Sequence, residues 1–171
     1  MDADGRIKVM LITSRETRRW VVPKGWVGKR STPHRQAAVE AFEEAGLVGK
    51  IRLPALGSYQ YDKYVRGQVT KLRVDVFLLD IESQSAEWPE KGQREAVWVL
   101  PAEAAAMVAE PDLAAILAGV EAQIASGPRD YCRIPTGLKK RAPWGAQLVS
   151  IGRPMPKLLR ESGKLSKVLG R

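Results

Sequence analysis

Three glutamates on one side of an expected helix limit what this chain can form. Glu40, Glu43 and Glu44 stand at positions i, i+3 and i+4, so their carboxylates project from the same side of a helix. No lysine or arginine lies three or four residues from any of them, and like charges at this spacing repel. Carboxylates without a local partner predict a bound cation, most simply Mg²⁺, which prefers oxygen ligands.

The limits of this helix are marked by the residues at its two ends. Thr32 suits the N-cap, Pro33 suits the first helical position, and Gly46 suits the position after the last turn. The opposite side of the helix carries mostly small and apolar residues that suit packing on a sheet. They are Ala38, Ala41, Phe42 and Ala45.

A basic loop that contains two glycines precedes the helix. Residues 24–30 read Lys-Gly-Trp-Val-Gly-Lys-Arg and lead to the helix N-terminus, where backbone N–H groups favour anions. Carboxylates that hold a metal beside a basic loop suit a phosphorylated substrate. An acidic helix face is by itself more often a solvated surface than a metal site. The spacing of the whole segment is needed to distinguish the two.

The rest of the chain up to residue 127 alternates short strands with helices. Leu72, Val74, Val76 and Leu78 alternate along the longest expected strand and are predicted to share one face. Strands are expected at 7–13, 20–22, 69–81 and 96–100, with a strand or bent pair at 51–61, broken at Gly57, and a turn at 62–67. Helices are expected at 101–108 and 112–124.

The positive charge is concentrated at the C-terminal end. The formal net charge of +9 comes from residues 128–171, which hold 11 basic and 2 acidic residues, whereas residues 1–127 are neutral overall. We therefore expect a domain at 1–127 and a basic C-terminal extension at 128–171. The extension is either ordered on the body or a partly disordered arm, and such an arm could bind RNA or another polyanion.

The composition excludes several classes of protein. Cys132 is the only cysteine, so no internal disulfide forms, and a reducing compartment, the cytoplasm, is expected. With His34 as the only histidine, a Cys/His zinc site is excluded. The acidic start of the sequence does not read as a signal peptide, and the uncharged stretch 142–152 is too short and polar to span a membrane.

The segment 23–47, PKGWVGKRSTPHRQAAVEAFEEAGL, resembles a known motif. Its spacing from Gly25 to Leu47 fits the Nudix box, G-x5-E-x7-R-E-U-x-E-E-x-G-U with U aliphatic, without a gap. Ser31 replaces the first glutamate of the box and Val39 replaces its arginine. If those two residues pair in the family, losing both together is nearly neutral, which favours a repacked active box.

The flanking segments extend the resemblance over about residues 6–125. TSRETRRWVVPKGW and WPEKGQREAVWV are similar to the diphosphoinositol polyphosphate phosphohydrolase branch of the Nudix family. The resemblance implies an α/β fold, a Nudix-type α/β/α sandwich in which a mixed, curved sheet lies between the box helix and the C-terminal helices.

The resemblance also implies roles for the box residues. Glu40 and Glu44 would hold Mg²⁺, or Mn²⁺ in its place, and Glu43 and the carbonyl of Gly25 would complete the metal ligands. Glu43 would be the base that activates water, although other branches give this role to the glutamate at Glu40. The expected reaction is cleavage of a phosphoanhydride bond.

Substrate phosphates would be bound by polar and basic residues that match the family pattern. For each of them an ordinary solvated surface position is the alternative. They are Ser14, Arg15, Lys24, Lys71 and Arg94. Glu90 and Glu95 would add a carboxylate or, more simply, pair with Lys91 or Arg94. Trp26 would stack on a base or cover the site.

Two main functions remain open from the sequence. The first is a Mg²⁺-dependent pyrophosphohydrolase acting on a highly charged small molecule, a diphosphoinositol polyphosphate or a dinucleoside polyphosphate. The alternative is a non-catalytic nucleotide- or RNA-binding Nudix module, suggested by Ser31, Val39 and the basic extension. A nucleotide-sugar or ADP-ribose hydrolase is a weaker third. No membrane partner is expected, and the sequence leaves the oligomeric state open.

Overall fold

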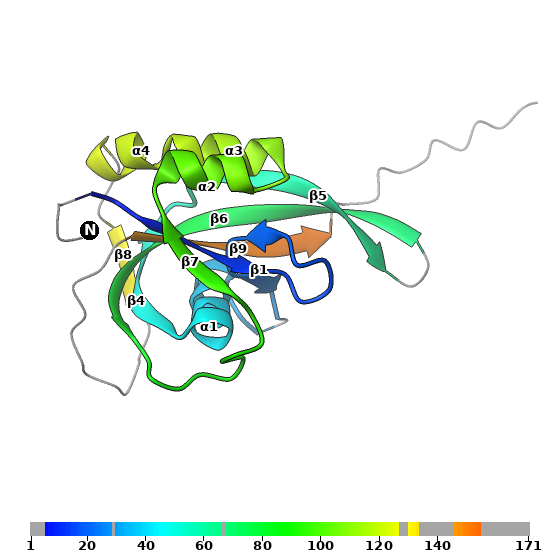
Figure 1. Cartoon of the computed structure of the whole chain (residues 1–171), viewed down its shortest axis with the longest axis horizontal. Coiled ribbons are helices and arrows are strands. Elements are labelled where there is room, and N and C mark those ends of the chain that lie inside the picture. The colour runs from blue at the N-terminus through cyan, green and yellow to red at the C-terminus, as the bar shows by residue number, and fades with distance from the viewer. Residues whose placement is uncertain (1–5, 29, 66–67, 127–129, 134–145, 155–171) are drawn as a thin grey trace, which may run out of the picture.

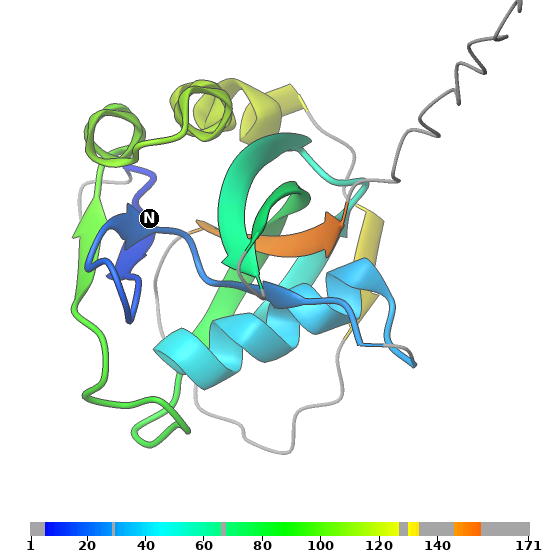
Figure 2. The same cartoon turned by 90° about the vertical axis from the view of Figure 1, so that its right-hand side faces the viewer.

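The chain folds into three layers, with helices on both sides of β-sheet. The structure, a computed structural model, describes residues 6–28, 30–65, 68–126, 130–133 and 146–154. Helix α1 (Pro33–Ala45) lies on one side of the sheets and helices α2 to α4 lie on the other (Figure 1). Figure 2 shows the same arrangement from the end of the molecule. The predicted α/β/α sandwich with a mixed sheet is confirmed.

The smaller sheet has three antiparallel strands. Its order is β2 (Trp20–Val21), β1 (Val9–Thr13) and β7 (Ala96–Val99), so β1 lies in the centre. β1 is buried along its whole length because both of its faces are covered. All three strands lie where the sequence predicts them.

The larger sheet is built around the long strand β6 (Gln68–Gln84). β6 pairs with β9 along one edge and with β5 and then β4 along the other, all antiparallel. β3 pairs with β9 in parallel, which makes the sheet mixed. The other strands are β3 (Lys24–Trp26), β4 (Leu47–Leu53), β5 (Gly57–Val65), β8 (Asp130–Arg133) and β9 (Ala146–Pro154).

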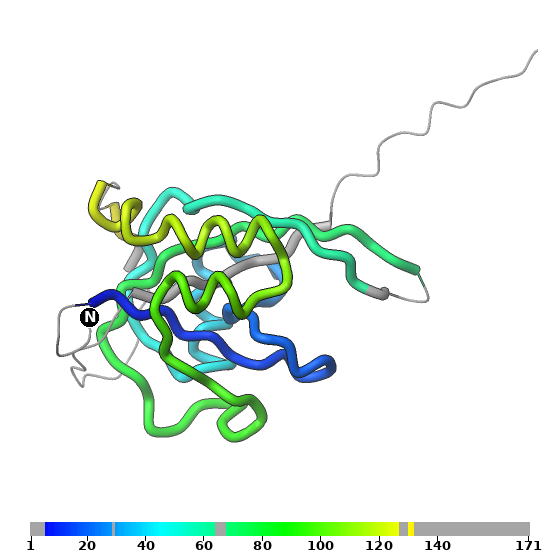
Figure 3. The backbone as a smooth tube through the Cα atoms, turned by 45° about the horizontal axis from the view of Figure 1, so that its top comes forward, coloured from blue at the N-terminus to red at the C-terminus, as the bar shows by residue number. Residues whose placement is uncertain are grey.

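Several strand limits differ from the prediction. The segment expected as a strand or bent pair is the pair β4 and β5, so that alternative is confirmed. The turn expected at 62–67 is wrong in extent, because β5 continues to Val65 and extends beyond the body with β6 (Figure 3). β2 ends at Val21, before Pro23, and β3 begins directly after this proline in the larger sheet.

The helices on the second side follow their proline signals. α2 (Pro101–Met107) and α3 (Pro111–Ala118) each begin at a proline. The single helix expected over 112–124 is two helices, because α3 ends at Ala118 with Gly119 as its C-cap and α4 (Val120–Ser126) follows. In the part of the chain that the structure describes, no helix is long and apolar enough to cross a membrane.

Two segments of the basic extension belong to the larger sheet. β8 pairs with β4, and β9 lies between β3 and β6. The described part of 128–171 is therefore ordered on the body, and the sheet continues across the division expected at residue 127. The division into a domain and an extension stays a prediction. The basic stretches 138–145 and 157–171 lie outside the described residues, and with them the predicted polyanion contact.

Two apolar clusters fill the space between the layers. One packs β1, β5 and β6 against α2 to α4 and includes Tyr59, Val74 and Leu113. The other packs β1, β4 and β6 against α1 and includes Ile12, Phe77 and Leu79. The alternation predicted for β6 is confirmed, because Leu72, Val74, Val76 and Leu78 are all buried.

The buried face of α1 differs from the predicted face. Ala37, Ala41 and Ala45 are buried and stand at i, i+4 and i+8, so this line of small side chains faces the sheet. Ala38 packs beside the cluster, whereas Phe42 is only partly buried. The three alanines let the helix approach closely, which a face centred on the bulky Phe42 would prevent.

Candidate active site

A single cavity brings most of the predicted site residues together. Its volume is about 550 Å³, and it lies among α1, β3, the loop after β1 and the base of the β5–β6 hairpin. It is lined by Ser14, Arg15, Glu16, Thr17, Arg19, Val21, Lys24, Gly25, Trp26, Glu40, Glu44, Tyr61, Asp62, Lys63, Leu72, Val74, Glu90 and Arg94. Two predicted residues, Glu43 and Lys71, are not among the lining.

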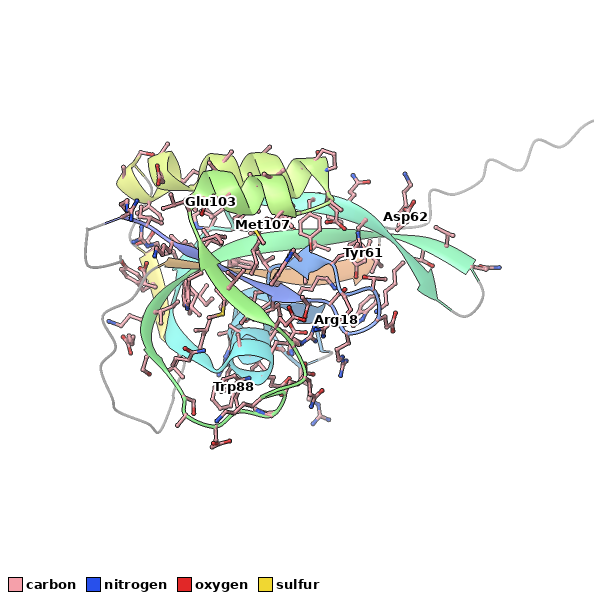
Figure 4. All side chains as sticks on the ribbon, viewed as in Figure 1. Arg18, Tyr61, Asp62, Trp88, Glu103 and Met107 are labelled. Atoms are coloured by element: carbon pink, nitrogen blue, oxygen red, sulfur yellow. The ribbon has the colours of Figure 1, made fainter. Side chains whose placement is uncertain are left out.

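The position of α1 at this cavity is fixed at its C-terminal end. Gly46 adopts φ 69°, and its N–H donates to the carbonyls of Ala41 and Phe42, as expected for a residue that ends a helix. Trp88 packs so closely on Gly46 that any Cβ there would overlap the indole (Figure 4). The C-terminal end of α1 and the loop that carries Trp88 therefore hold the glutamates of α1 in place.

The three glutamates of α1 lie in different environments. Glu44 is buried, with 8% of its surface exposed, whereas Glu40 is partly buried and Glu43 is exposed. Successive helical residues are about 100° apart, so Glu43 turns toward solvent when Glu44 lies beside the buried alanines. Only the i, i+4 pair Glu40 and Glu44 lines the cavity.

Glu44 has partners that no local pattern indicates. Its Oε2 accepts a hydrogen bond of 2.9 Å from the backbone N–H of Lys24, and its Oε1 pairs with Nη2 of Arg94. The expectation that no basic side chain offsets these carboxylates is wrong for Glu44. The spacing of residues within one helix reveals only partners in that helix. Arg94 comes from a loop 50 residues further along the chain.

Arg94 is held on every side of its guanidinium. Nε donates to Oε2 of Glu90 at 2.8 Å and Nη1 donates to the carbonyl of Thr13 at 3.0 Å. Only 7% of the Arg94 side chain is exposed. The ion pair expected between Glu90 and Arg94 is confirmed, and Glu90 also contacts Arg15 at 3.3 Å. Arg94 lines the cavity, but its donors bind the protein itself.

Glu40 lies directly against the backbone of β3. A Cβ added at Gly25 would overlap the Glu40 carboxyl group, so only glycine leaves room for it. Gln36 donates a hydrogen bond of 3.0 Å to Oε1 of Glu40. Glu40 and the main chain of Gly25 are thus neighbours, as the predicted metal site requires.

Burial changes the protonation of the groups at this site. Burial raises the pKa of Glu44 to about 7, although the Lys24 N–H and then Arg94 act in the opposite direction. Burial also raises the pKa of Glu40, and the hydrogen bond from Gln36 opposes this. The pKa of Lys24 is lowered, mainly by burial. Each shift favours the neutral form, because burial disfavours the charged one. For Glu40 and Glu44, a bound cation would offset this cost of burying a negative charge.

The mouth of the cavity is aromatic. Trp26 is 44% exposed, and the Lys63 ammonium lies 5.4 Å from the centre of its ring. The Lys24 ammonium lies 5.2 Å from the centre of the Tyr61 ring. Tyr61 and Asp62 stand where the hairpin leaves the body (Figure 4). Of these residues, Tyr61, Asp62 and Lys63 have no local sequence pattern that marks them as part of a site.

The donor set at the cavity suits Mg²⁺. Among the described residues, no group of three or more Asp, Glu, His or Cys side chains converges on one point. Mg²⁺ does not need such a group, because it commonly binds one or two carboxylates and completes its octahedron with water and substrate phosphates. Glu40, Glu44 and the main chain of Gly25 supply oxygen donors of this kind.

Comparison with known proteins gives one informative match. The chain is 29% identical over 109 residues to "Nudix hydrolase 13, mitochondrial" from Arabidopsis thaliana, covering 58% of this chain and 52% of the plant protein. The chain thus spans about half the length of the curated relative it matches, and no family model matches it. The similarity supports Nudix membership but not the diphosphoinositol branch. The location expected in the cytoplasm stays a prediction.

Proposed function

We propose that this protein is a Mg²⁺-dependent pyrophosphohydrolase that cleaves a phosphoanhydride bond in a phosphorylated small molecule. The observation that carries the proposal is the cavity that Glu40, Glu44 and Gly25 line together with Arg15 and Lys24. Acidic oxygens for a metal and basic groups for phosphate in one cavity are what this chemistry needs. The similarity to a Nudix hydrolase supports it.

The residues of the cavity divide into binding and catalytic roles. Glu40 and Glu44 would hold the metal with the Gly25 carbonyl, and the metal, when bound, would lower the pKa of a water ligand and neutralise phosphate charge. Arg15, which is exposed, and Lys24 would bind substrate phosphates, with Ser14 beside them. Of the two candidate bases, Glu40 lines the cavity and Glu43 lies outside it, so Glu40 is the better placed.

The lining favours a dinucleoside polyphosphate over a diphosphoinositol polyphosphate. Its charged side chains are balanced, with five basic and five acidic residues. A lining without net positive charge offers little attraction for an inositol that carries phosphates on all sides, whereas a linear polyphosphate has fewer charges to place. The exposed ring of Trp26 offers a stacking surface for a base at the mouth of the cavity.

A substrate panel tests this proposal. Metal-stripped protein would be assayed with Mg²⁺, with Mn²⁺ and with chelator, against a dinucleoside tetraphosphate, a diphosphoinositol polyphosphate, a nucleotide sugar, ADP-ribose and capped RNA. We expect the highest kcat/KM for the dinucleoside substrate and no turnover with chelator. Trp26→Ala should raise KM for that substrate about tenfold and leave inorganic tripolyphosphate hydrolysis unchanged. Hydrolysis of no substrate under any condition would refute the proposal.

A non-catalytic nucleotide-binding module is the second candidate. One observation favours this candidate: Glu44 is already paired with a cationic side chain, that of Arg94. It predicts that a nucleotide binds equally well with Mg²⁺ and with chelator and is recovered intact. Calorimetry followed by chromatography of the ligand separates the two candidates.

A further inference from the structure

Arg94 is a buried arginine that contacts Glu44, one of the carboxylates expected to bind the metal. We propose that Arg94 is the positioning residue of the metal site, holding the Glu44 carboxylate in the orientation that binds the ion. This inference rests on the proposed function, since it concerns the same metal. It assigns Arg94 a role other than the substrate contact that the sequence suggests.

The contacts of Glu44 fix its carboxylate from two separate segments. The Lys24 N–H of β3 donates to Oε2, and the Arg94 guanidinium of the loop before β7 donates to Oε1. A carboxylate oxygen has about two lone pairs, so one donor on each oxygen leaves a second lone pair on each. Glu44 lines the cavity together with Glu40, so both residues border the space where the ion is expected.

The contacts of Arg94 prevent it from turning into the cavity. Its Nε and Nη1 are bound to Glu90 and to the carbonyl of Thr13, so three acceptors from three segments surround the guanidinium. Glu90 is itself tied to α1, because its N–H donates to the Glu43 carbonyl at 3.0 Å. Arg94 therefore joins β1, the loop and the helix at one rigid point.

The charge of this cluster also leaves a demand for a cation. Arg94 pairs with Glu44 and Glu90, and Arg15 also pairs with Glu90, whereas Glu40 accepts a hydrogen bond from the neutral Gln36. Arg94 thus lowers the repulsion around Glu44, and among these contacts of the described residues no ion pair offsets Glu40, although the cavity lining as a whole is balanced in charge. Removing a group that hydrogen-bonds to a metal-binding carboxylate commonly lowers metal affinity about 10- to 100-fold, because that group fixes the orientation of the carboxylate.

Arg94 does not stand at the position of the arginine in the sequence motif. Val39 stands where the Nudix box has arginine, and it is 38% exposed and outside the cavity lining. Arg94 contacts Glu44 of α1 from a different segment, the loop before β7. Restoring an arginine at position 39 should therefore not replace Arg94.

The test measures metal binding separately from activity. Mn²⁺ affinity would be measured by calorimetry for the wild type, Arg94→Gln and Arg94→Lys, with thermal unfolding of each variant recorded alongside. Arg18→Gln is the matched control, because Arg18 ties the same loop through the Gln93 carbonyl and Glu95 but does not touch α1. We expect Arg94→Gln to weaken Mn²⁺ binding at least about tenfold, Arg94→Lys to recover part of this, and Arg18→Gln to change it less than about twofold.

The possible results separate this inference from the proposed function. If the wild type binds Mn²⁺ and hydrolyses substrate but folded Arg94→Gln binds equally well, the positioning role is wrong and the enzyme stands. Tighter binding by Arg94→Gln would mean that Arg94 competes with the metal, which also overturns the role. If the wild type binds no Mn²⁺, both proposals fail. Should Arg94→Gln not fold, Arg94→Lys decides, because it keeps the charge and loses the fork of donors.

Discussion

Gly25→Ala should remove activity while leaving the fold almost intact. Gly25 lies in β3, and a Cβ at this position would overlap the carboxyl group of Glu40. The group in the way is the far end of a side chain that can rotate, so the backbone of β3 does not need to move. The carboxylate must instead leave the main chain of Gly25 and its hydrogen bond from Gln36.

The magnitude follows from what is lost. One hydrogen bond of 3.0 Å from Gln36 contributes about 1 kcal/mol to stability, which corresponds to a fall in Tm of about 2–4 °C for a chain of this size. Displacing a catalytic group by about 1 Å costs about 100-fold in rate. We therefore expect kcat to fall by about two orders of magnitude at a small cost in stability.

The assay pairs thermal unfolding with hydrolysis of a dinucleoside polyphosphate, and Gly28→Ala is its control. A Cβ at Gly28 would meet only the Gln36 Oε1 atom at 3.8 Å, an ordinary contact, so this variant should keep both stability and rate. The reasoning is refuted if Gly25→Ala hydrolyses substrate at the wild-type rate. It is also refuted if the variant unfolds outright, because the clash would then lie in the backbone.

Three further outcomes follow from the same structure. Gly46→Ala should destabilise the chain by about 2 kcal/mol in urea unfolding, because an L residue at φ 69° is strained and its Cβ meets Trp88. Arg52→Gln should cost about 2 kcal/mol in the same assay, because Arg52 donates to both oxygens of Asp80 at 2.8 and 3.0 Å. The pKa of Glu44 is raised by burial from 4.5 to about 7 in the folded, metal-free chain, so its contribution to stability is complete below the unfolded pKa and is lost as pH rises through about 7. Melting curves of metal-free protein between about pH 5 and 8 should therefore fall with pH more for the wild type than for Glu44→Gln, and equal slopes would contradict this.

The sequence predicts those parts of the fold that local patterns determine. The limits of α1 follow from Pro33 and Gly46, and the buried positions of β6 follow from the alternation that includes Val74 and Val76. The cavity lining contains Glu40 and Glu44, which the motif spacing indicates. These features depend on residues that are near neighbours in the chain.

The rest depends on contacts between distant segments. The pairing of Glu44 with Arg94 and the placement of β9 beside β6 join residues far apart in the sequence, and no spacing rule connects them. Lys63 lines the cavity and lies in β5, which continues into the segment expected to be a turn. Glu43 and Glu44 separate because a helix that buries alanines on one line turns adjacent residues to different surroundings.

The most direct test of the proposed function compares two neighbouring glutamates of α1. The measurement is the Mg²⁺-dependent kcat for hydrolysis of a dinucleoside tetraphosphate by Glu40→Gln and by Glu43→Gln, each with an unchanged melting temperature. Because Glu40 lines the cavity and Glu43 does not, we expect Glu40→Gln to lose about 10²- to 10⁴-fold and Glu43→Gln to lose far less. Equal activity of Glu40→Gln and the wild type would contradict the proposal that this cavity is the active site.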